Sequence, residues 1–165
     1  MTVFNFKITT LVAVASFLAS AASAQVPLTE RNVSMAMAQA IIAGAMEHCI
    51  KGGNTVAIVI VDRAGQVIAS LRSDGAAPHL MEVTRMKAYT SLIRRLTTRE
   101  FAQATASGDG LLLRQIPGVM ALGGGVPIKI GNETIGAIGV GGTQGPGADE
   151  ACANAGIEKI AAQLK

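Results

Sequence analysis

A short segment of the chain, residues 79–90, gathers most of the side chains that could support cofactor chemistry. It combines candidate iron ligands with cations that can pair with acids: His79, Met81, Arg85, Met86, Lys87, Tyr89 and Thr90. A haem group needs such a mixture, because apolar walls hold the macrocycle, one or two side chains ligate the iron, and cations pair with the propionates. The segment therefore predicts a haem site on this part of the chain.

Plainer roles stay open for the same residues. Met81 and Met86 occur at helical spacing, where methionine commonly fills a core. His79 lies near an expected helix start and also fits a solvated residue. Arg94 and Arg95 at the end of the segment fit a solvated face.

Several common sites can be set aside. The three glycines at 123–125 are not followed by Lys-Ser or Lys-Thr, so they do not form a phosphate-binding P-loop. The later Gly-x-Gly has Gln144 where a dinucleotide fingerprint requires its third glycine. Neither Cys49 nor Cys152 begins a C-x-x-C-H motif, which excludes covalent attachment of haem. Any haem would be bound non-covalently.

No catalytic residue is assigned from the sequence. Ser73, Asp74 and His79 are types found in hydrolase triads, but they lie within seven residues and no nucleophile elbow accompanies them. His48 and Cys49 are adjacent on an expected helix and point about 100° apart, which argues against a shared metal. Whether the protein is an enzyme stays open.

The elements around the segment follow from apolar spacing and turn residues. The segment itself is predicted to be a helix over residues 78–95, with Pro78 in its first turn. A helix over residues 29–50 is predicted to begin at Thr29. A β-branched run at 55–61 and a second strand at 66–71 are joined by an Asp-Arg-Ala-Gly turn.

The second half of the chain predicts further strands and helices. Thr97 and Glu100 have the spacing of a capping box, which predicts a helix over 98–106. Residues 111–116 fit strand or helix, and residues 119–122 are predicted to be a strand. A last helix is predicted over 148–164, with Asp149 and Glu150 at its positive end.

The glycine-rich stretch at 123–142 is predicted to be a hairpin. Its strands, 126–130 and 134–140, are separated by a Gly131-Asn132 turn. Its glycines leave backbone bare, which predicts that the helix at 85–90 or a planar ligand lies against it. Together these elements predict a single α/β (α+β) domain, with a mainly antiparallel sheet of about five strands and helices packed on it.

Residues 1–24 have the pattern of a signal peptide. Lys7 precedes an apolar run at 8–19, and Ala22-Ser23-Ala24 is a small-x-small cleavage site. This run is shorter than the roughly 20 residues of a membrane span, and no second span follows. The mature domain is therefore expected over 25–165, in a periplasmic or secreted location.

Charge and composition limit the choice of partners. Without Lys7, thirteen basic residues face eleven acidic ones, and the chain has one Tyr and no Trp. Such a mild charge without a stacking platform argues against nucleic acid. Abundant small apolar residues favour a buried subunit interface, so we expect a homo-oligomer. Cys49 and Cys152 allow a single disulfide or two buried free thiols, and the sequence leaves both open.

Six motifs in order resemble the GlcG/HbpS-like haem-binding (haem-degrading) family. They cover essentially the whole mature chain: V-A-I-V-I-V-D-R-A-G at 56–65, L-R-S-D-G-A at 71–76, R-M-K-A-Y-T at 85–90, I-P-G at 116–118, G-G-G-V-P-I at 123–128 and I-G-A-I-G-V-G-G at 135–142. The resemblance implies one α/β domain on an antiparallel sheet, symmetric oligomers, and haem binding in secreted members.

The resemblance also implies roles for single residues. It points to Thr90 as the iron ligand, with Lys87 and Tyr89 beside it. His79 is outside the family pattern, so its place as a second candidate ligand depends on its chemistry alone. The family often has Ser where this chain has Gly141.

The leading interpretation is an exported haem-binding protein that stores, delivers or slowly degrades haem. One alternative is a small-molecule enzyme or accessory protein of hydroxy-acid or corrinoid metabolism, which the resemblance also allows. Another is an oligomeric sensory or interaction protein.

Overall fold

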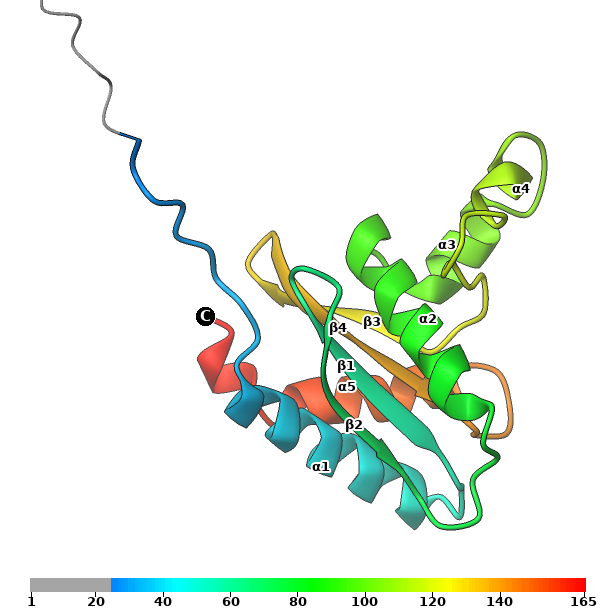
Figure 1. Ribbon diagram of the computed structural model, residues 1–165. Helices are drawn as coiled ribbons and strands as arrows, with labels where there is room; N and C mark the ends of the chain where they lie inside the picture. The colour runs from blue at the N-terminus through cyan, green and yellow to red at the C-terminus, as the bar shows by residue number, and fades with distance from the viewer. Residues whose placement is uncertain (1–24) are drawn as a thin grey trace, which may run out of the picture.

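The computed structural model describes residues 25–165 as one antiparallel sheet with helices on both faces (Figure 1). The predicted signal peptide at 1–24 lies outside the described residues. The elements, in chain order, are α1 (Met35–Lys51), β1 (Ala57–Asp62), β2 (Val67–Arg72), α2 (Leu80–Arg94), α3 (Thr98–Ala104), α4 (Gly110–Leu113), β3 (Gly125–Ile130), β4 (Glu133–Gly141), α5 (Ala148–Glu158) and a 3₁₀ turn (Ala161–Gln163).

The sheet has the strand order β2-β1-β4-β3, and each neighbouring pair is antiparallel. Two tight hairpins supply the outer pairs. The side chain of Asp62 accepts a hydrogen bond from the backbone N of Gln66 in the first, and Ile130 pairs with Glu133 across the Gly131-Asn132 turn in the second. The predicted fold class and both hairpins are confirmed.

The sheet has four strands rather than about five. Residues 119–122 form no strand, because the backbone N of Met120 donates to the Thr90 hydroxyl on α2 instead of to a neighbouring strand. The ambiguous segment at 111–116 contributes only the single-turn helix α4.

Helix α1 begins at Met35, six residues after the predicted start at Thr29. Ser34 is the N-cap, and its hydroxyl accepts a hydrogen bond from the backbone N of Met37. The preceding residue, Val33, is held in extended backbone because its N–H donates to the carbonyl of Ile135 on β4. This tertiary contact outweighs the local helix signal of residues 29–34.

Helices α1 and α5 cover one face of the sheet, where the larger apolar core lies. This core includes Ile41 and Ile42 from α1 and Ile58, Ile60 and Ile138 from the sheet. The two helices pack closely, since a Cβ on Gly156 would lie 2.5 Å from the Ile41 carbonyl oxygen. A disulfide joins Cys49 on α1 to Cys152 on α5, with the two Cα atoms 5.6 Å apart. The question that the sequence left open is thus answered in favour of the disulfide.

Helix α2 lies on the opposite face, directly against bare glycine backbone of β3 and β4. A Cβ on Gly139 would lie 2.0 Å from the carbonyl oxygen of Thr84, and one on Gly125 would lie 2.3 Å from that of Lys87. Side chains at these positions would push α2 off the sheet. The prediction that the glycine-rich hairpin is bare for a neighbour is confirmed, and the neighbour is the helix.

Helices α3 and α4 project beyond the sheet as an arm (Figure 1). The predicted capping box is present at the start of α3, where Thr97 and Glu100 each accept a backbone hydrogen bond from the other. Within residues 25–165, no helix combines the length and apolar character needed to cross a membrane.

Candidate functional site

One face of α2 opens onto a cavity of about 520 Å³, here called the glycine cavity. The helix contributes His79, just before its first residue, and then Leu80, Val83 and Lys87. The opposite wall comes from the start of α3, the end of β4, the start of α5 and the loops beside them: Arg99, Leu122, Gly123, Gly141, Gly142, Thr143, Gly145, Pro146, Gly147 and Asp149. The spacing of three and four residues brings the helical side chains to one side.

Lys87 lies at the inner end of the glycine cavity with only 2% of its side chain exposed. Its Nζ donates to Asp149 Oδ2 at 2.7 Å and to the Val140 carbonyl at 2.9 Å. A lysine buried to this extent needs such partners, because an unpaired ammonium would lose its hydration without compensation. The cation predicted for the site is therefore present but already neutralised.

The acidic partner is fixed by its position at the start of α5. Asp149 Oδ1 accepts hydrogen bonds from the backbone N of Thr143 at 3.1 Å and from its hydroxyl at 2.7 Å. Beside it, Arg99 donates to Glu150 Oε2 at 2.7 Å. The other oxygen of Glu150, Oε1, is buried and has no hydrogen-bond partner among the described residues.

Glycine at position 141 leaves room around Lys87. A Cβ there would lie 3.0 Å from Thr84 Cγ2 and 3.5 Å from Lys87 Nζ. The serine that the family resemblance leads one to expect would thus crowd α2 at this point. In this chain the lysine is bound by the carbonyl and the carboxylate alone.

The residues predicted from the sequence to bind haem do not all line the same cavity. His79 and Lys87 line the glycine cavity, whereas Tyr89 lines a second cavity at the other end of α2. Thr90 is completely buried, and its hydroxyl accepts the hydrogen bond from Met120 N at 2.8 Å. Its proposed role as an iron ligand stays a prediction, and would require that bond to open.

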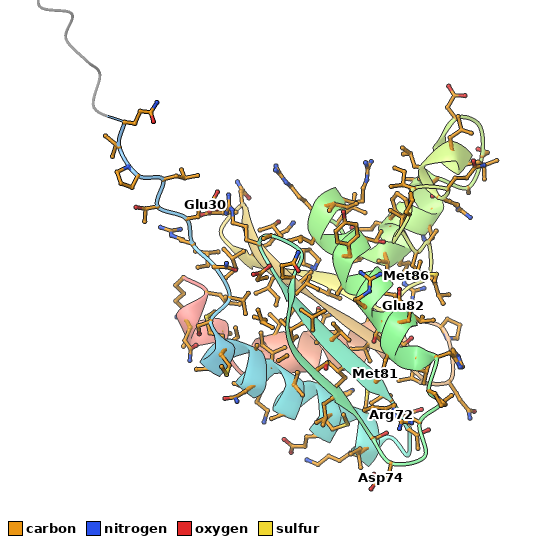
Figure 2. The ribbon with its side chains drawn as sticks, in the orientation of Figure 1. Glu30, Arg72, Asp74, Met81, Glu82 and Met86 are labelled. Carbon is orange, nitrogen blue, oxygen red and sulfur yellow. A yellow bond between two sulfur atoms is a disulfide. The ribbon has the colours of Figure 1, made fainter. Side chains whose placement is uncertain are left out.

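Arg85 and Met86 lie away from the glycine cavity. Met81, Glu82 and Met86 project from α2, and Met86 is half-buried (Figure 2). Arg85 donates two hydrogen bonds to Glu82, which lower the pKa of that carboxyl and raise the pKa of the guanidinium. An acidic ligand at Arg85 would have to compete with this pair.

The sequence did not identify the partners that hold Lys87 and Arg99. The sequence places Asp149 and Glu150 at the positive end of the last helix, and the structure shows both in its first turn. Lys87 and Asp149 are 62 positions apart, and only the packing of α5 beside β4 brings them together. The adjacent acidic pair near a Gly-Pro-Gly loop was the available signal.

The residues of the glycine cavity fit a haem group. The volume is within the usual range for a ligand pocket, roughly 300–1,000 Å³, and Leu80, Val83 and Leu122 give it apolar walls. His79 is solvent-exposed and can present an imidazole nitrogen to a metal. Bare glycine backbone at 141 and 142 allows a planar molecule to approach closely.

Comparison with known proteins agrees with this reading of the fold. The family model described as haem degrading protein HbpS-like matches residues 33–158. Protein GlcG of Escherichia coli K12 is 33% identical over 112 residues, which cover 68% of this chain and 83% of GlcG.

Solved structures show the same architecture. A double mutant of HbpS from Streptomyces reticuli is 30% identical, with a TM-score of 0.73 over 82% of this chain and 97% of HbpS. A complex of PduOC with haem has the same fold, with a TM-score of 0.71 over 78% of this chain and 95% of PduOC, at 23% identity. With the family match over residues 33–158, these findings show that the chain belongs to the HbpS-like family of haem-degrading proteins.

Proposed function

We propose that this protein binds haem non-covalently in the glycine cavity. The observation that carries the proposal is the face of α2 on which His79, two apolar side chains and Lys87 open onto one cavity of about 520 Å³. Membership of the HbpS-like family supports it, as does the solved haem complex of PduOC, which shares the fold.

Each group in the cavity has a defined part in this proposal. His79 would offer its imidazole to the iron, and Leu80, Val83 and Leu122 would supply the apolar walls for the ring. Lys87 is paired with Asp149, and Arg99 with Glu150. A haem propionate would pair with either cation by replacing its carboxylate partner. When bound, haem supplies a redox-active iron whose reactivity depends on its ligands and on the polarity around it.

A hemin titration tests the proposal. We expect the mature chain to give a Soret shift that saturates at a fixed stoichiometry, and His79→Ala to weaken binding at least tenfold. His48→Ala is the matched control, because His48 is the only other histidine and lies exposed on α1. Thr90→Ala tests the competing ligand: if it abolishes the shift while His79→Ala leaves it intact, the iron is bound from the Thr90 side. Absence of any saturable shift would refute haem binding.

Export to the periplasm or the medium is also proposed. The signal-peptide pattern at 1–24 supports it, and the Cys49–Cys152 disulfide suits an oxidising compartment. Cell fractionation should recover a chain that begins at Gln25 outside the cytoplasm. For the purified mature chain loaded with hemin, loss of the Soret band with release of iron in the presence of a reductant and dioxygen would indicate haem degradation, and a Soret band that persists would indicate storage or delivery.

We also propose that the protein forms a homo-oligomer through the α3–α4 arm. The arm and the loop that follows it leave three large apolar side chains exposed: Leu111 at 45%, Leu112 at 61% and Ile116 at 45%. Such side chains gathered on a projecting element are typical of a contact surface. Light scattering after gel filtration should show a multimer that Leu112→Glu dissociates. Ile50→Glu on α1, at a similar exposure of 54%, should leave the mass unchanged.

A further inference from the structure

A second cavity, of about 460 Å³, lies where both hairpin turns meet the end of α2. We call it the hairpin cavity. Its lining comes from the β1–β2 turn, the β3–β4 turn and the last turns of α2: Arg63, Ala64, Tyr89, Leu92, Ile93, Arg95, Asn132, Glu133 and Thr134. None of these residues lines the glycine cavity. The hairpin cavity is therefore a separate place for a ligand.

Arg95 stands in this lining with an unusual backbone. It caps the C-terminal end of α2 with φ at +58°, and it is the only non-glycine residue within 25–165 with a positive φ. Helices commonly end on such a residue, but it is usually glycine, because a Cβ is strained in the left-handed region. Strain retained at one position is typical of sites where the side chain has a task. Here that side chain faces the cavity.

The acidic side chains around the hairpin cavity pair with other arginines, which leaves Arg95 free to bind an anionic ligand. Arg63 is bound by Glu133 and by Glu30, the latter at 3.3 Å; Glu30 lies on the extended segment before α1 (Figure 2). Glu133 is also shared with Arg31 at 3.6 Å. Arg95, by contrast, has no carboxylate within 4.0 Å in the described part of the chain. The cavity thus presents one guanidinium without an acidic partner.

Two hydroxyl groups in the lining also lack partners. The Tyr89 ring is fixed between two turns, since a Cβ on Gly65 would lie 3.1 Å from its Cε2 and one on Gly118 would lie 3.6 Å from its Cδ1. Its hydroxyl forms no hydrogen bond with residues 25–165. The Thr134 hydroxyl is buried and likewise without a partner in that range. Beside these groups, Leu92 and Ile93 add an apolar wall.

We propose that the hairpin cavity binds a small organic carboxylate. The Arg95 guanidinium is a fork of parallel N–H groups that matches the two oxygens of a carboxylate. The Tyr89 hydroxyl can donate a further hydrogen bond to such a ligand. The wall of Leu92 and Ile93 favours a ligand with a carbon skeleton over inorganic phosphate, which would leave that wall uncovered.

Tyr89 supplies a direct readout, because the chain has one tyrosine and no tryptophan. The chain spanning 25–165 is titrated with cyclohexanecarboxylate, which does not absorb in the range of tyrosine fluorescence. We expect a saturable change in emission and a matching heat in calorimetry. Cyclohexylmethanol, which has the same ring without the charge, should bind at least tenfold more weakly.

Arg95→Gly is the decisive variant, because it removes the guanidinium and also the backbone strain. It should weaken carboxylate binding at least tenfold while its urea midpoint equals or exceeds that of the parent chain. Arg94→Ala removes an equal charge one residue away, outside the lining, and should bind as the parent does. Arg95→Lys keeps the charge without the fork, so an intermediate loss is expected.

Three outcomes would overturn the proposal. They are unchanged carboxylate binding in Arg95→Gly, equal loss in Arg94→Ala, or inorganic phosphate that binds as tightly as the carboxylate. The hemin titration of Arg95→Gly should match that of the parent chain. Failure of carboxylate binding is therefore distinguishable from failure of haem binding.

Discussion

Lys87 brings a charge into the interior of the protein and satisfies it with one carboxylate and one carbonyl. The R-M-K-A-Y-T motif at 85–90 contains this lysine, and the sequence alone predicts a cation ready for an acidic ligand. The structure shows a cation that already has a partner. A ligand acid in the glycine cavity must therefore exchange with Asp149 or bind beside it.

The buried pair should be strongly coupled. Lys87→Met and Asp149→Asn are each expected to lower the free energy of unfolding by about 3 kcal/mol, because each leaves a largely buried charge without its partner. The double variant should cost at least about 1 kcal/mol less than the sum of the two single effects. Urea unfolding followed by circular dichroism measures all three.

An ion pair on the surface provides the control for the Lys87 and Asp149 variants. Arg85 and Glu82 are partly exposed neighbours on α2, so Glu82→Gln should change stability by less than about 0.5 kcal/mol. If the Lys87 and Asp149 effects were additive, the ion pair would not contribute to stability as a unit. The position of Lys87 in the glycine cavity would then depend on packing alone.

The contact between α2 and β4 decides which elements surround the candidate site. This contact requires glycine in the strand, since Thr84, Lys87 and Ala88 of α2 pack directly on glycine backbone. Gly139→Ala should therefore lower the free energy of unfolding by at least about 3 kcal/mol, because its Cβ would overlap the Thr84 carbonyl. Thermal or urea unfolding checks this value.

Gly131→Ala is the comparison for Gly139. A Cβ on Gly131 meets nothing within 4 Å, and only its φ of +57° opposes the change. Its expected cost is about 1 kcal/mol, from backbone strain alone. Equal costs at the two positions would mean that α2 can move away from the sheet without penalty.

Elements with strong local chemistry could be predicted from the sequence. The Asp62 turn, the Gly131-Asn132 turn and the Thr97 capping box each depend on residues that are close together in the chain. The start of α1 and the strand at 119–122 were predicted wrongly because residues distant in the sequence determine the backbone there. The Ile135 carbonyl accepts the N–H of Val33, and the Thr90 hydroxyl accepts that of Met120. The candidate site shows the same division. His79 and Lys87 belong to the predicted segment 79–90 and both line the glycine cavity, but Asp149 and Arg99 join them only through tertiary packing.

Across the whole molecule, the Cys49–Cys152 disulfide joins segments from opposite ends of the described chain. The two cysteines are separated by 103 positions. In the chain-entropy model a loop of that length contributes about 4 to 5 kcal/mol to stability. The Cys49→Ala/Cys152→Ala double variant should lose stability on this scale, as measured by urea unfolding under oxidising conditions.

Dithiothreitol separates this effect from side-chain packing. The reductant should lower the unfolding midpoint of the parent chain and leave that of the double variant unchanged. If the parent chain showed the same midpoint in both conditions, the disulfide would contribute nothing to the free energy of unfolding.

Helices α1 and α5 cover one face of the sheet and α2 covers the other (Figure 1). The disulfide joins the first two helices, whereas both cavities border α2. One face is therefore covalently fixed, while the other carries the side chains that a ligand can contact. The exposed lining residues His79 and Ile93 can change without disturbing this crosslinked face, whereas Lys87 and Gly139 also hold α2 against the rest of the fold. In evolutionary terms, new ligand preferences are expected to arise first at such exposed lining positions, while the buried Lys87 and the glycines under α2 stay constrained by packing.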